Sequence, residues 1–176
     1  MKSQAETAGH LANTAGTRPQ RGTVLRDVEI SKADGTQSIL ASLRGSCSLV
    51  MIFTAGCDIN DLIASLANLA STIKEHNARV LIVAKAREEV AANSDLENQV
   101  FLLAIDDNKG IHRTLGATDA AQNPLPTLYI TDRFGEVFAA FRSENPASLP
   151  GTEEIVRWLE FIECQCEECS PSEWQE

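Results

Sequence analysis

The sequence lacks any long apolar run. No window approaches the roughly 18 consecutive apolar residues that a membrane-spanning helix needs, so we expect no insertion into a membrane. Residues 1–20 also lack the apolar core of a secretory signal peptide. Together these two absences predict a cytoplasmic protein.

Positive charge is scarce as well. The 176-residue chain has 15 Lys and Arg against 25 Asp and Glu, which gives a formal net charge of −10. Nucleic acids and anionic membranes attract basic surfaces, so this balance argues against both as partners. The hydrophobic share of 43% is ordinary for a globular chain, and the length fits one domain with a sizeable core.

A disulfide framework of the secreted type is also missing. The number of cysteines is odd, and three of the five crowd the C-terminus: Cys47, Cys57, Cys164, Cys166 and Cys169. Secreted disulfide scaffolds use even numbers of spread cysteines, so the pattern favours a reducing compartment. We divide the chain into a flexible tail over residues 1–21, a domain over 22–163 and a cysteine-rich acidic tail over 164–176.

What the chain does contain is a short apolar run that ends in a cysteine. Residues 49–53 predict a buried strand, which Thr54-Ala55-Gly56 interrupts before Cys57. A helical stripe follows, carried by Ile59, Leu62, Ile63, Leu66, Leu69, Ala70 and Ile73. A cysteine at this junction faces the positive end of the helix dipole, which favours the reactive thiolate. The alternative is a small buried side chain that ends a strand.

The remaining segments predict a mixed α/β arrangement. Residues 79–84 form a second buried run after the helix, so the two strands should be parallel with a right-handed crossover. The other expected elements are a strand over 23–30, a turn over 33–36, a short helix over 88–93, a strand over 99–104, a helix over 110–115 capped by residues 106–108, a hairpin over 128–141 and a final helix from residue 152.

Several of these segments resemble a known superfamily. The similar pieces are Asp34-Gly35 with Leu43-Arg44-Gly45, the run from Phe53 to Cys57, and Leu125-Pro126-Thr127 followed by Asp132-Arg133-Phe134-Gly135. In this order they resemble the redoxins, which include the alkyl hydroperoxide reductase/thiol-specific antioxidant group and the TlpA/ResA-like proteins. The resemblance covers residues 22–162. It implies a thioredoxin-like three-layer α/β fold, with a central mixed sheet and helices on both faces.

The resemblance also implies a site. Cys57 would be the nucleophile and Thr54 a polar helper. Pro126 would follow a cis peptide bond and lie beside Cys57, with the backbone before it free to pair with a substrate chain. The substrate would be a peroxide or a protein thiol or disulfide, and the chain would be a thiol peroxidase or oxidoreductase.

Three residues depart from the patterns of the family. Asn60 stands where a Cys-x-x-Cys motif has its second cysteine, so Cys57 lacks the usual partner that releases a mixed disulfide. The peroxiredoxin pattern Pro-x-x-x-Thr-x-x-Cys has Val50 in place of its proline, and Asp58 opposes a neighbouring thiolate by like charge. The sequence assigns no arginine to this site among Arg113, Arg133 and Arg142.

Three interpretations of Cys57 therefore stay open: a one-cysteine peroxidase nucleophile, a thiol resolved by another cysteine of this chain or a partner, and a remnant in a scaffold without chemistry. The last is part of a second hypothesis of a different class. In it the redoxin fold is a non-catalytic binding module that docks to a larger protein assembly. Cys47, ahead of the strand, is expected to be structural.

The tail motif Cys164-x-Cys166-x-x-Cys169 has four interpretations of its own. With a fourth ligand from elsewhere its thiols could bind zinc, or they could bridge two chains. Cys166 and Cys169 could instead form a redox pair that resolves Cys57, or the thiols could simply contact a partner. Acidic neighbours disfavour thiolates here unless a metal is bound. No other cofactor is expected, and His76 and His112 are interpreted as structural or solvated.

Overall fold

A computed structural model describes residues 19–165, except 33–34, 56, 59 and 87–99. Seven strands form one mixed sheet in the order β2-β1-β5-β4-β3-β6-β7. The strands are β1 (Glu29–Lys32), β2 (Gln37–Ile39), β3 (Ser48–Phe53), β4 (Ala78–Ala84), β5 (Phe101–Ile105), β6 (Thr127–Thr131) and β7 (Val137–Arg142). Among the described residues, no helix is long and apolar enough to cross a membrane.

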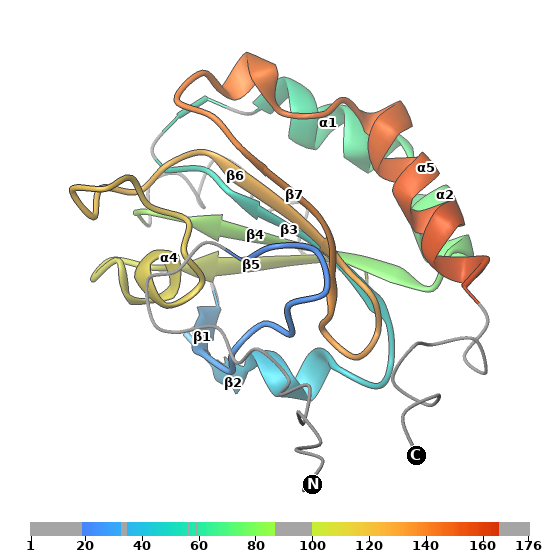
Figure 1. The fold of residues 1–176 in the computed structure, drawn as a ribbon, viewed down its shortest axis with the longest axis horizontal. Coiled ribbons are helices and arrows are strands. Elements are labelled where there is room, and N and C mark those ends of the chain that lie inside the picture. Colours follow the sequence, from blue (N-terminus) through green and yellow to red (C-terminus); the bar gives the residue numbers. More distant parts are fainter. Residues whose placement is uncertain (1–18, 33–34, 56, 59, 87–99, 166–176) are drawn as a thin grey trace, which may run out of the picture.

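Helical elements cover both faces of this sheet, so the domain has three layers (Figure 1). On one face lie α1 (Asn60–Asn68), α2 (Ala70–Glu75) and α5 (Thr152–Glu163). The other face carries α4 (Gly110–Thr114) and the 3-10 helix η1 (Leu40–Leu43). A further 3-10 turn, η3 (Pro146–Ser148), leads into α5. The predicted α/β class with a central mixed sheet is confirmed.

The central strand is β3, as the apolar run predicts. It pairs in parallel with β4 and antiparallel with β6. Its side chains alternate, so Val50 and Ile52 face the layer of α1, α2 and α5, while Met51 and Phe53 face α4. Because both faces are covered, all of these residues are buried. This double burial explains why the run is apolar without alternation.

The long helix predicted after Cys57 is divided in two. It breaks at Leu69, whose φ of −103° and ψ of 16° leave the helical region. The Leu69 N–H bonds to the Leu66 carbonyl, which tightens the last turn of α1 before α2 begins. The apolar stripe still points to one core, because Ile63, Leu66 and Ile73 are all buried. The stripe therefore identified the packing face but missed the break.

The strand predicted over residues 23–30 is also divided. Val24 makes an isolated bridge with Glu136 at the edge of β7, whereas β1 begins at Glu29 and pairs with β2 and β5. One continuous strand could not reach both edges, because five strands lie between β1 and the far side of β7. The chain therefore crosses one face of the sheet between these two pairings.

Two of the segments that resemble redoxins, residues 43–45 and 132–135, contact each other at the end of the sheet where β6 turns into β7. The Gly45 N–H donates to the Arg133 carbonyl at 2.6 Å. The Arg44 side chain donates to the Leu25 carbonyl and pairs with Asp27 at 3.2 Å. The turn residue Gly135 has a φ of 84° and lies against the Arg44 side chain. The hairpin prediction is confirmed, and the helix predicted over 88–93 lies outside the described residues.

Candidate functional site

Cys57 lies at the edge of the sheet where the parallel strands β3, β4 and β5 end. Ligands of α/β proteins bind outside the carboxyl ends of parallel strands, where the connecting loops leave the sheet. The Cys57 side chain is half-buried, whereas Cys47 is buried and Cys164 is exposed. Cys57 therefore combines a fixed position with access for a small molecule.

A tight turn positions Cys57. Its N–H donates to the Thr54 carbonyl at 2.9 Å, and the Thr54 N–H donates to the Val83 carbonyl at 3.1 Å. Thr54 is buried, with 4% of its surface exposed. Ala55, inside the turn, has a φ of 54°, a left-handed conformation that costs a non-glycine residue about 1–2 kcal/mol. The packed core beneath Thr54 holds this strained turn in place.

The helix after the site begins later than the sequence indicates. Its first residue is Asn60, so Cys57 precedes the first helical turn. The Asp58 carboxylate accepts the Asn60 N–H at 2.9 Å, which is a helix-capping role. The exposed Asp58 therefore has a structural role, because its carboxylate accepts an N–H at the start of α1. Cys57 itself lies outside the first turn of α1, where the field of a helix dipole is strongest.

Pro126 lies beside Thr54 on the neighbouring strand. The register pairs Phe53 with Thr127, and one step further along both strands brings Thr54 and Pro126 together. This proximity agrees with the place that the resemblance gives to Pro126. Both residues are buried, so they belong to the packed part of the sheet edge next to Cys57.

The conformation expected at Pro126 is wrong. Its peptide bond is trans, which is the ordinary state of an X–Pro bond. The backbone before it is also occupied, since the Leu125 N–H donates to the Ala117 carbonyl at 3.0 Å. The Leu125 carbonyl accepts the Thr127 hydroxyl at 2.9 Å. These internal bonds satisfy the groups that were expected to pair with a substrate chain.

Of the three candidate arginines, Arg142 is the one that the strand register places near Phe53. Arg142 pairs with Thr127 in the register of β6 and β7, two strands away from Phe53. Its guanidinium donates to the Thr118 carbonyl at 2.6 Å. Arg113 is exposed on α4, and Arg133 lies in the turn at the opposite end of β6.

Cys164 lies at the other end of the helical layer. It is the C-cap of α5, and its neighbour Glu163 contacts His76 at the end of α2. Cys57 precedes α1, so the two cysteines lie at opposite ends of the helical layer. Cys166 and Cys169, the other candidate resolving residues, lie outside the described residues.

A buried carboxylate–imidazole pair, which the sequence did not reveal, lies near the base of the site. The His112 Nδ1 atom is 2.6 Å from the Asp106 Oδ2 atom, and the His112 side chain is fully buried. The His112 ring packs edge-on against Phe53, the last residue of β3, with 5.2 Å between centroids. The helix cap predicted over residues 106–108 includes Asp106. A capping pattern does not predict that the Asp106 carboxylate also contacts the His112 ring.

Hydrogen bonds control the charge of Asp106. Burial by itself would raise the pKa of its carboxyl group, but hydrogen bonds from His112 and Ile111 outweigh burial and lower that pKa. Asp106 accepts the N–H groups of Ile111 at 3.0 Å and of His112 at 2.8 Å. The His112 Nε2 atom is buried without a hydrogen-bond partner in the described part of the chain. The pair is therefore a structural support, which agrees with the interpretation of His112.

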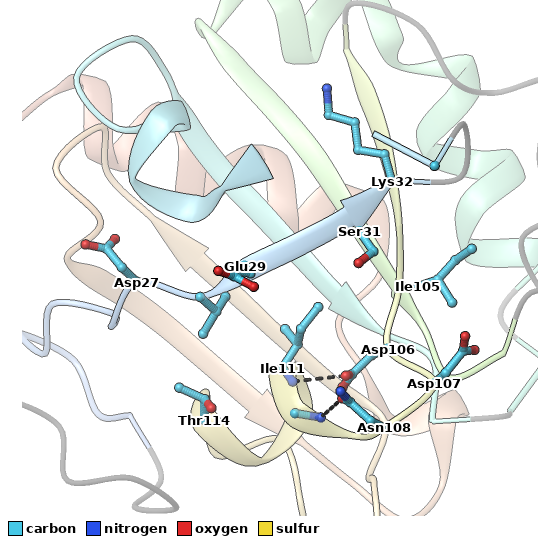
Figure 2. Close-up of a pocket in the computed structure, with 13 residues that line it drawn as sticks. Asp27, Glu29, Ser31, Lys32, Ile105, Asp106, Asp107, Asn108, Ile111 and Thr114 are labelled. Atoms are coloured by element: carbon cyan, nitrogen blue, oxygen red, sulfur yellow. Dashed lines mark hydrogen bonds between the residues drawn. The ribbon is translucent and has the colours of Figure 1, made fainter. Parts of the chain in front are cut away.

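A hollow of about 610 Å³ lies between β1 and α4, away from Cys57 (Figure 2). Asp27, Glu29 and Lys32 line one side of it, and Asp106 and Asp107 line the other. No cysteine is among the described residues that line it, so this hollow is separate from the Cys57 turn.

Comparison with known proteins gives a consistent result. The model of the AhpC/TSA family matches residues 22–140. No curated protein matches the chain. Peroxidoxin BcpB from Mycobacterium tuberculosis is similar in structure, with a TM-score of 0.67, 17% identity and coverage of 82% of this chain and 99% of that one.

Two more solved structures are similar. The reduced 2-Cys peroxiredoxin of Plasmodium vivax has a TM-score of 0.66 and 17% identity, with 81% of each chain covered. The thiol peroxidase of Chromobacterium violaceum has a TM-score of 0.64 and 13% identity, with coverage of 85% of this chain and 91% of that one. At these identities the likeness establishes a shared fold.

Proposed function

Because the chain belongs to the AhpC/TSA family, we propose that it is a thiol-dependent peroxidase whose nucleophile is Cys57. Membership of this family supports a thiol-dependent peroxidase or oxidoreductase function. The observation that carries the assignment to Cys57 is its position: it is half-buried, held by the Thr54 turn, and lies at the carboxyl edge of β3. Cys47 is buried, and Cys164 lies at the other end of the helices.

The proposed chemistry begins at the Cys57 sulfur. The thiolate attacks one peroxide oxygen, so an S–O bond forms while the O–O bond breaks. The electron pair of that bond leaves on the second oxygen, which takes up a proton and departs as water or an alcohol. Cys57 is then a sulfenic acid. A thiol from a reductant attacks its sulfur and releases water, and a second thiol reduces the resulting disulfide.

Two observations favour a peroxide over a polypeptide disulfide as the substrate. Asn60 replaces the second cysteine of a dithiol motif, so a mixed disulfide with a protein would lack an adjacent thiol to release it. The backbone of Leu125, which would pair with a polypeptide, is already hydrogen-bonded to Ala117 and Thr127. A small peroxide needs neither feature.

The position of Cys164 argues against it as the resolving thiol. A disulfide needs its two Cα atoms about 5.5–6 Å apart, and Cys164, the C-cap of α5, lies at the opposite end of the helical layer from Cys57. Cys166 and Cys169 lie outside the described residues. The resolving step therefore falls to one of these two, to a small thiol or to a protein thiol of another molecule.

The test is stopped-flow oxidation of the reduced, full-length protein by hydrogen peroxide and by an alkyl hydroperoxide. A sulfenic-acid probe and mass mapping then locate the modified residue. We expect labelling at Cys57 and its loss in Cys57→Ser, while Cys164→Ser, which removes an exposed thiol, keeps the wild-type rate. A folded protein whose Cys57 is never oxidised would defeat the proposal and favour the binding-module hypothesis.

A further inference from the structure

A loop that precedes β6 lies at the same edge of the sheet as Cys57 (Figure 1). Strands β3 and β6 are antiparallel, and Phe53 at the end of β3 pairs with Thr127 at the start of β6. The chain that enters β6 therefore meets the chain that leaves β3 towards Cys57. Residues 118–124, which we call the rim loop, lie just before this point.

The rim loop is closed by its own hydrogen bonds. Thr118 and Pro124 form a β-bridge at its base. The Asp119 N–H donates to the Asn123 carbonyl at 2.8 Å, and the Asp119 carboxylate accepts the Asn123 N–H at 2.7 Å and its side-chain Nδ2 at 3.1 Å. The loop is therefore held in one conformation, although residues 120–123 at its tip are exposed.

The backbone of the rim loop is strained in the same way as the Cys57 turn. Gln122 has a φ of 65° and Ala55 a φ of 54°, and both are non-glycine residues in the left-handed region. Of the four described residues of this kind, three lie at this edge of the sheet: Ala55, Lys109 and Gln122. Such conformations persist where surrounding contacts hold them, and they gather at functional sites.

The end of β7 holds the rim loop against the sheet. The Arg142 Nη1 atom donates to the Thr118 carbonyl at 2.6 Å, a charge-assisted hydrogen bond. The next residue, Ser143, donates its N–H to the Pro126 carbonyl at 3.1 Å. Hydrogen bonds from Asn123, and to a lesser extent the charge of Arg142, lower the pKa of the Asp119 carboxyl group. The loop is thus fixed from inside and from β7.

We propose that the rim loop limits the size of the peroxide that reaches Cys57, and that Arg142 is the positioning residue that holds this loop. The inference rests on the proposed peroxidase function. Arg142 acts through the Thr118 carbonyl and does not touch the peroxide. Hydrogen peroxide is small enough to pass the held loop, whereas a bulky alkyl group contacts it. Loosening the loop should therefore favour bulky peroxides selectively.

The test compares the rate constants for oxidation of Cys57 by cumene hydroperoxide and by hydrogen peroxide, measured by stopped flow on the full-length protein. Both peroxides are neutral, so an effect of the lost charge on the Cys57 thiolate changes both constants equally and cancels in their ratio. Arg142→Met should raise the ratio of cumene hydroperoxide to hydrogen peroxide at least about threefold. Arg142→Lys, which can still donate to Thr118, should give a lower ratio than Arg142→Met.

The matched control is Arg113→Met, which removes the same charge from an exposed position on α4 and should keep the wild-type ratio. Asp119→Ala loosens the loop from inside and should raise the ratio as Arg142→Met does. Circular dichroism shows whether each variant is folded, and Asp119→Ala carries the test if Arg142→Met is not.

Alkylation of Cys57 by iodoacetamide and by a bulky maleimide, mapped by mass spectrometry, measures access without any peroxide. If wild-type Cys57 reacts with neither peroxide, the proposed function fails, and the alkylation ratio still shows whether the loop limits access. The inference is overturned if Arg142→Met and Asp119→Ala keep the ratio of Arg113→Met in both assays, or if they change the two rate constants by the same factor.

Discussion

Replacing Asp106 by alanine should destabilise the domain strongly, because its carboxylate is buried, with 3% of the residue exposed. Its carboxylate accepts three hydrogen bonds, from the N–H groups of Ile111 and His112 and from the His112 ring. The truncation leaves all three donors buried without an acceptor. It also removes the carboxylate partner of an imidazole that is fully buried.

The expected loss follows from these three bonds. Hydrogen bonds to a charged group contribute about 1.5–3 kcal/mol each, and a buried donor left without an acceptor costs about 1–3 kcal/mol. The contributions overlap, so we expect Asp106→Ala to lower the free energy of unfolding by about 3–5 kcal/mol at neutral pH. With a urea m-value of about 2 kcal/mol/M, the midpoint would fall by about 2 M.

The loss should also depend on pH. The pKa of Asp106 is lowered from 3.8 in the folded protein. A lowered folded-state pKa contributes stability that is present above the unfolded-state value and is lost as pH falls through the folded-state value. The difference in unfolding free energy between wild type and Asp106→Ala should thus be full at pH 7 and shrink below about pH 3.8. Urea titrations at several pH values measure it.

Asp107→Ala is the matched control, because Asp107 is the adjacent residue and is exposed. It should change stability by no more than about 0.5 kcal/mol. The reasoning is refuted if Asp106→Ala costs less than about 1 kcal/mol, or if its cost stays the same from pH 7 to pH 3. Either result would mean that the carboxylate at the end of β5 does not hold α4 in place.

Two further predictions concern other parts of the core. Gly135→Ala should lower the free energy of unfolding by about 2–3 kcal/mol in thermal or urea denaturation, because an added Cβ at a φ of 84° would lie 2.7 Å from the Arg44 Nε atom. The control Gly35→Ala, with a φ of 85° and no atom within 4 Å of the added Cβ, should cost only about 1 kcal/mol. Equal costs would show that the clash with Arg44 contributes nothing. Tyr129→Phe should cost about 1–2 kcal/mol, because its hydroxyl donates to the buried Leu115 carbonyl at 3.0 Å, and an unchanged urea midpoint would show that this bond contributes nothing.

The elements that the sequence predicted well are those with a strong local signal. The run over residues 49–53 is apolar at every position because β3 is buried on both faces, so its place at the centre of the sheet could be read directly. The hairpin of β6 and β7 was predicted because Asp132 and Gly135 are turn residues, and the Asp132 carboxylate does accept the N–H groups of Phe134 and Glu136.

The errors lie where tertiary contacts override local pattern. The stripe after Cys57 continues through Leu69 without interruption, so periodicity could not reveal the break between α1 and α2. Residues 23–30 look like one strand, but Thr23 and Leu25 bond to the edge of β7 while β1 bonds to β5. The backbone before Pro126 is occupied by a loop contact that local pattern does not show, since the Leu125 N–H donates to the Ala117 carbonyl.

By itself the sequence determined the fold class, the central strand and the position of Cys57 at a strand-to-helix junction, because burial and turn chemistry are local properties of neighbouring residues. It also determined that Asn60 removes the dithiol mechanism. Only the tertiary structure decided which thiols and side chains lie together. It placed Cys57 and Cys164 at opposite ends of the helical layer and brought His76 to Glu163, since distances between residues remote in sequence are set by how the helices pack on the sheet.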